Sequence, residues 1–131
     1  MKKDGSKGTK KPPEPSSSHA EIAEWMGRQM PDLQPIVKRL DKVIRQAIDG
    51  PRYAIKWQKA YYGSSDLGWI IEMVAYDISV NLVFLGGANF DDPPPDGTGT
   101  SRYVKLRSVE EAEAREVHEW IEEAARTRGG N

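Results

Sequence analysis

The chain has 131 residues, a length typical of one domain that buries its own hydrophobic core. Its formal net charge is −1 and it contains no cysteine. The charge argues against general binding to nucleic acids or membrane surfaces, and the lack of cysteine excludes disulfides, thiolate metal sites and cysteine nucleophiles. The sequence has no apolar run of the length typical of a membrane span or a secretion signal, so we expect a cytoplasmic protein.

The first part of the chain predicts a tail followed by two helices. Residues 1–17 are rich in Lys, Gly, Pro and Ser, which is typical of a disordered basic tail. The motif Ser18-His19-Ala20-Glu21 matches a helix-start capping box and predicts a helix over residues 19–29. Apolar residues at helical spacing predict a second helix that begins near Pro35 and ends before Asp49-Gly50-Pro51.

Strand-type sequence follows the second helix. Runs of β-branched and aromatic residues predict four strands, over residues 53–57, 69–75, 78–85 and 102–107. Between the last two lies a connection of residues 86–101 without periodicity, and loops of this length are usually functional or disordered.

The C-terminal part predicts one long helix. Ser108-Val109-Glu110-Glu111 is a second capping box, and the helix is expected to run to about Arg126 before a frayed end at residues 128–131. Residues 18–127 therefore form one predicted domain. The predicted fold class is α+β: two N-terminal helices, an antiparallel sheet of about four to five strands and a C-terminal helix, with the helices on one face.

Several segments, taken in order, form a familiar series: the helix Leu33–Ile48, Ile55-Lys56-Trp57, Ala60-Tyr61-Tyr62-Gly63, the hairpin 68–85, and Gly97-Thr98-Gly99 leading into residues 102–108. Over about residues 20–125 the chain resembles the YdhG-like domain family. The resemblance implies a small bacterial-type α+β domain, and some relatives are described as frataxin-like intracellular iron chaperones. Many relatives carry Lys after Gly-Thr-Gly, where this chain has Thr100, so one cation of a phosphate-type site is missing.

The glycine-rich loop and the basic strand after it suggest an anion site. The candidate ligands are the backbone of Gly97 and Gly99 with the side chains of Arg102 and Lys105, joined by Lys56 from a neighbouring strand. Strand alternation places Arg102 and Lys105 on opposite faces, so both serve one ligand only if Arg102 lies in the loop or at a bulge. The alternative is a glycine turn followed by an exposed basic edge strand.

The acidic last helix suggests a second hypothesis, a metal site. His118 and Glu122 are i,i+4 neighbours, and Glu119 lies beside them, so these three residues are the candidate ligands for ferrous iron. The alternative is a solvated acidic helix face.

The sequence contains no nucleophile–base constellation, so we expect no enzymatic activity. The first hypothesis is a binding module for a small anionic ligand or partner group, without a cofactor. The alternatives are an iron chaperone that binds ferrous iron and a protein-interaction module. The latter would use the basic face of the second helix, formed by Lys38, Arg39, Lys42 and Arg45.

Overall fold

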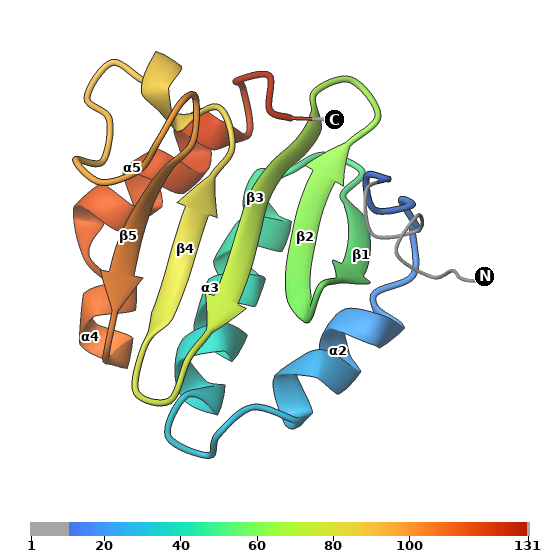
Figure 1. The fold of residues 1–131 in the computed structure, drawn as a ribbon, viewed down its shortest axis with the longest axis vertical. Helices are drawn as coiled ribbons and strands as arrows, with labels where there is room; N and C mark the ends of the chain where they lie inside the picture. Colours follow the sequence, from blue (N-terminus) through green and yellow to red (C-terminus); the bar gives the residue numbers. More distant parts are fainter. Residues whose placement is uncertain (1–10, 131) are drawn as a thin grey trace.

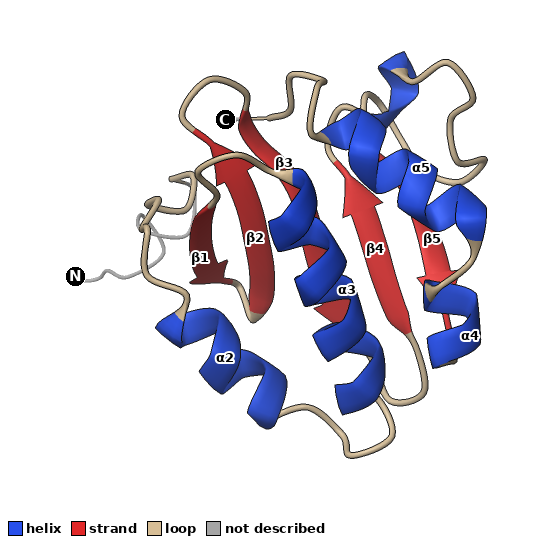
Figure 2. Cartoon of the chain, turned by 180° about the vertical axis from the view of Figure 1, so that it is seen from behind, coloured by secondary structure: helices blue, strands red, loops and turns tan. Residues whose placement is uncertain are grey.

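The computed structural model describes residues 11–130. Five antiparallel strands form one sheet in the order β1-β2-β3-β4-β5, and the helices cover one face of it (Figures 1 and 2). This confirms the predicted α+β class. The elements are α2 (Ala20–Gly27), α3 (Gln34–Ala47), β1 (Arg52–Lys56), β2 (Lys59–Ser64), β3 (Gly68–Ala75), β4 (Val80–Phe84), the short 3-10 helix η1 (Gly87–Asn89), β5 (Arg102–Leu106), α4 (Val109–Ala112) and α5 (Arg115–Ala124).

Helix α3 lies across the middle of the sheet because it has one strongly apolar side (Figure 2). Its buried residues include Ile36, Leu40 and Ile44, and Pro35 occupies the first turn, where its missing N–H has no helical partner. The capping box predicted at Ser18 does not form. His19 occupies the N-cap position of α2, and the Ser18 hydroxyl accepts a bond from the Ala20 amide at 3.3 Å.

The sheet contains one strand more than the four located from the sequence. Strand β2 follows β1 through the two-residue turn Trp57-Gln58, in which both residues have positive φ angles of 53° and 63°. This turn has no glycine or asparagine, so the usual hairpin signal is absent. Trp57, which the alternation placed on a strand, therefore lies in a turn. Ile78, predicted on the core face of the third strand, also lies in a turn and is 74% exposed.

A bulge in β3 changes which side chains face away from the helices. Tyr62 pairs with Ile71 and Gly63 pairs with Trp69, so Ile70 is an additional residue on β3. A bulge shifts the alternation by one residue. As a result, Trp69 and Tyr61 lie on the same face of the sheet, the one that carries no helix, while Ile71 packs in the main core.

The predicted C-terminal helix is two helices. The chain becomes extended at Ala114, between α4 and α5, and both segments pack against α3. The Ser108 hydroxyl caps α4 by accepting from the Glu111 amide at 3.1 Å. The Glu111 carboxylate completes the cap by accepting from the Arg107 amide at 2.7 Å.

Both ends of the described chain are more ordered than predicted. Ser16 exchanges two backbone hydrogen bonds with Tyr53, so residues 11–17 of the predicted tail pack against the domain. Trp69 and Gly130 exchange two more, which ties down most of the end predicted to fray. Residues 1–10 of the predicted tail, and Asn131, lie outside the described residues.

The long connection 86–101 is anchored to the domain. Phe90 is buried and its ring lies 5.5 Å from that of Phe84. The Trp120 indole donates to the Asp92 carbonyl at 2.7 Å. The loop therefore has an apolar anchor and polar tethers, which sequence periodicity does not reveal.

Candidate functional site

The glycine-rich loop uses its own basic residue to close itself. Gly97 has a φ angle of 141°, and a Cβ there would lie 2.2 Å from the Ser101 carbonyl oxygen, so the turn requires glycine. The Arg102 Nη1 atom donates to the carbonyls of Gly99 and Ser101 at 2.9 and 2.7 Å. This guanidinium therefore stabilises the loop backbone.

The other cations of the predicted anion site lie apart from Arg102. Arg102 pairs with Phe84, whose side chain is in the main core, whereas Lys105 pairs with Asn81 on the alternate face. The Lys105 ammonium lies 5.2 Å from the centre of the Tyr76 ring. Lys56 lies on β1, at the opposite edge of the sheet, and donates to the Lys11 carbonyl at 2.6 Å. The fold does not bring the five predicted residues together.

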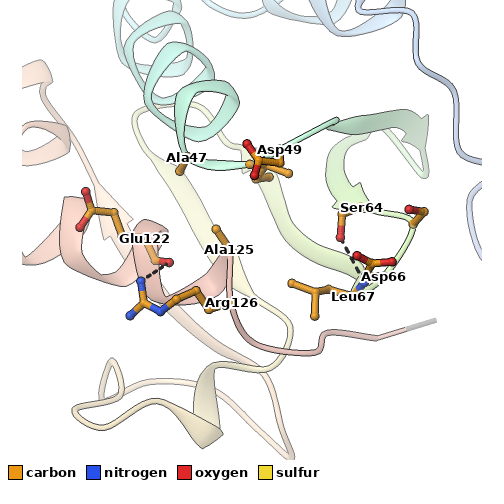
Figure 3. A pocket seen from close by; sticks show the side chains of 10 residues that line it. Ala47, Asp49, Ser64, Asp66, Leu67, Glu122, Ala125 and Arg126 are labelled. Carbon is orange, nitrogen blue, oxygen red and sulfur yellow. Dashed lines mark hydrogen bonds between the residues drawn. The ribbon is translucent and has the colours of Figure 1, made fainter.

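The predicted metal ligands His118, Glu119 and Glu122 all lie on α5. Glu122 borders a cleft of about 570 Å³ that also contains Asp49 and Asp66. Figure 3 shows the Glu122 carboxylate on the other side of the cleft from these two carboxylates. Within residues 11–130, no group of three or more His, Asp or Glu side chains is arranged to hold a metal ion, and this includes His118, Glu119 and Glu122.

A different cleft, between α2 and α3, gathers several cations. Its volume is about 690 Å³. Lys38, Lys42 and Arg45 are spaced four and three residues apart, which places them on one side of α3. The α2 side contributes His19, Ala23 and Met26. We refer to this site, with its floor residue Asp41, as the α2–α3 cleft.

Asp41 is the centre of a hydrogen-bond network at the floor of the α2–α3 cleft. It is 3% exposed, and its Oδ1 atom accepts from the Tyr62 hydroxyl and contacts His19 Nε2, both at 2.8 Å. Its Oδ2 atom accepts from Arg45 Nε at 3.1 Å. The three partners come from the start of α2, from α3 and from β2. Together they satisfy the hydrogen-bonding needs of the buried Asp41 carboxylate. The network fixes His19 and Arg45 at the cleft.

The same network affects two phenols. Burial, with the negative charge of Asp41 as the next cause, raises the pKa of the Tyr62 hydroxyl well above its usual value. Burial also raises the pKa of Tyr53, while the nearby Arg45 opposes this rise. Both phenols therefore remain protonated in the folded protein at pH values where free tyrosine ionises.

We expect alkaline pH to destabilise the protein through Tyr62. The folded-state pKa lies above the unfolded value near 10, so the stabilising contribution is complete below pH 10 and is lost as pH rises beyond it. One such group lowers the free energy of unfolding by up to about 1.4 kcal/mol per pH unit. Between pH 9 and 11, the free energy of unfolding measured with urea should decline less steeply for Tyr62→Phe than for the parent. The control is Tyr76→Phe, which changes an exposed tyrosine and should decline as the parent does. Equal slopes for Tyr62→Phe and Tyr76→Phe would contradict the prediction.

Sequence reasoning did not identify the Asp41 network, although one signal was present. Asp41 lies one residue after Leu40 and three before Ile44, within the apolar stripe of α3. An acidic residue at such a position is buried and needs partners. The partners themselves, His19 and Tyr62, are distant in sequence and meet Asp41 only in the folded chain.

Comparison of the chain with protein-family models, with curated proteins and with solved structures found no match. The resemblance to the YdhG-like family thus stays a prediction. Among residues 11–130, no helix combines the length and apolar character needed to cross a bilayer.

Proposed function

We propose that this protein is a binding module for a small anion carrying phosphate or carboxylate groups, and that the anion binds in the α2–α3 cleft. The observation that carries this proposal is the convergence of Lys38, Lys42 and Arg45 on one cleft whose floor is a satisfied carboxylate. The proposed ligand is of the class predicted from the sequence, a small anion. The proposed site is the α2–α3 cleft in place of the Gly97–Lys105 segment.

The charges of the α2–α3 cleft favour an anion. Lys38, Lys42 and Arg45 contribute +3 and Asp41 contributes −1, which leaves +2 before any charge on His19. Arg45 is held by Asp41, so less side-chain entropy is lost when its remaining donors bind a ligand. The volume of about 690 Å³ lies within the range of small-molecule sites.

The proposal is tested by calorimetry at fixed salt with inorganic phosphate, pyrophosphate and citrate as probes. We expect at least one probe to bind the parent, and Lys38→Gln with Lys42→Gln to weaken it about tenfold or more, because hydrogen bonds to charged groups contribute about 1.5–3 kcal/mol. Lys105→Gln removes a cation from the opposite face and is the matched control. Loss of binding in Lys105→Gln alone would return the site to the glycine-rich loop, and no binding of any probe would contradict the proposal.

We further propose that the chain is a YdhG-like domain that acts in the cytoplasm without catalysis. The order of its helices and strands supports the family assignment. Among the described residues, the His19 ring nitrogen contacts the Asp41 carboxylate and no hydroxyl nucleophile, and this supports binding over catalysis.

A further inference from the structure

An aromatic cluster lies on the face of the sheet that carries no helix. Tyr61 and Trp69 are packed edge to face with ring centres 5.8 Å apart, and Trp57 lies 6.2 Å from Tyr61. Leu85 packs against the same cluster. The bulge in β3 is what directs Trp69 to this face. We call the surface formed by Trp57, Tyr61, Trp69 and Leu85 the aromatic groove.

The segment that covers the aromatic groove is rich in proline. Residues 11–15 read Lys-Pro-Pro-Glu-Pro, and Pro13 is buried. The Trp69 Nε1 atom donates to the Pro13 carbonyl at 3.1 Å. Consecutive prolines favour the extended polyproline conformation, whose carbonyls have no internal partner. An aromatic surface with an indole N–H directed at such a carbonyl is the chemistry by which proline-rich peptides are recognised.

The turn beside the aromatic groove contains Trp57 in an unfavourable backbone conformation. Trp57 has a φ angle of 53°, which is unfavourable for a bulky side chain, yet its side chain remains 42% exposed. The Trp25 indole holds the turn by donating to the Gln58 carbonyl at 3.0 Å. Asn-Gly would form this turn with less strain. Backbone strain of this kind is concentrated at functional sites, so it motivates a binding role for Trp57.

We propose that the aromatic groove is a binding site for extended proline-rich peptides, and that residues 11–15 are its intramolecular occupant. The partner is a proline-rich segment of another protein, which binds when the chain's own segment leaves. Open space remains on both sides of Pro12 and Pro13, in cavities of about 270 and 400 Å³. The Ser16–Tyr53 bridge joins the chain to β1 just beyond residues 11–15, so these residues can leave the groove while that bridge stays in place. This site is separate from the α2–α3 cleft, which lies on the helix side.

The first test uses the full chain with Pro12→Ser and Pro13→Ser to vacate the groove. The probe is a synthetic peptide of residues 11–17, and its binding is followed by tryptophan fluorescence and by the Trp69 indole N–H signal. We expect this variant to bind the peptide about tenfold or more tightly than the parent, in which the tethered segment competes at high effective concentration. Trp69→Phe in the same background keeps a ring but removes the donor, and should weaken binding about tenfold.

The proposal would be overturned if the vacated variant bound no peptide, if it bound equally a peptide with Ser in place of Pro12 and Pro13, or if binding were unchanged in Trp69→Phe. A vacated variant that forms dimers by light scattering, instead of binding peptide, would identify a second copy as the occupant and would also overturn it.

The second test separates a binding role for Trp57 from a structural one. Trp57→Asn with Gln58→Gly relieves the positive φ angles, so the melting temperature should rise by several degrees while peptide binding by the vacated variant weakens. A purely structural aromatic residue would lower the melting temperature when removed. A lower melting temperature, or unchanged peptide affinity, would contradict the proposed role.

Discussion

Replacing Asp41 by Ala is expected to lower the free energy of unfolding by about 3 kcal/mol, because the change removes the common partner of three polar groups. The Tyr62 side chain is fully buried and its hydroxyl donates to Asp41, so this hydroxyl loses its partner without regaining water. His19 and Arg45 are partly exposed and can be hydrated again, which limits their share of the loss. Urea unfolding at pH 7 measures the effect.

The control for Asp41→Ala is Asp49→Ala, two residues beyond the end of the same helix. Asp49 is exposed, and its replacement should change stability by less than about 0.5 kcal/mol. Tyr62→Phe removes one donor and leaves Asp41 with two partners, so its cost should be near 1 kcal/mol. In the Asp41→Ala background, Tyr62→Phe should restore part of the lost stability, because it removes the hydroxyl that Asp41→Ala leaves buried without a partner. Equal losses in Asp41→Ala and Asp49→Ala would contradict the central place of Asp41.

The fold class was predictable because its main signals are local. The amphipathic stripe of α3, the buried run of β3 and the alternation of β4 each depend on neighbouring residues. Strand β2 was not located because its turn, Trp57-Gln58, lacks the residues that normally adopt positive φ angles. The tertiary contact from Trp25 stabilises that turn, and such a contact is invisible to local pattern.

The candidate sites were less predictable, since each depends on contacts between distant residues. Gly97, Arg102 and Lys105 are close along the chain. Strand alternation nevertheless places the Arg102 and Lys105 side chains on opposite faces of the sheet. The α2–α3 cleft needs Asp41 to meet residues 22 and 21 positions away, His19 and Tyr62. The sequence predicts one basic helix face of Lys38, Arg39, Lys42 and Arg45, but Arg39 pairs with Glu113 at 2.9 Å outside the cleft. Only the position of α2 beside α3 (Figure 2) gives the other three a shared cleft.

Replacing Phe84 by Ala is expected to lower the free energy of unfolding by about 4 kcal/mol, from the lost transfer energy and the cavity that remains. Phe84 is fully buried, and its ring contacts those of Phe90 and Trp120, which come from the long connection and from α5. Since small domains are stable by only about 5–15 kcal/mol, the variant should approach the limit of folding. Urea unfolding measures the loss, and Phe84→Leu, which keeps most of the volume, should cost less than about 1.5 kcal/mol.

Phe84→Ala should also loosen the connection 86–101 beyond its effect on global stability. Phe90 is the buried apolar anchor of this segment, and the Ala88 amide bonds the Thr100 carbonyl across it at 3.0 Å. Without the Phe84 ring, Phe90 loses its partner and the loop opens locally. Hydrogen exchange should therefore accelerate more at Ala88 than at the Met73 amide in the central strand. Equal acceleration at both amides would mean that the loop unfolds only with the whole domain, and that Phe84 does not anchor it.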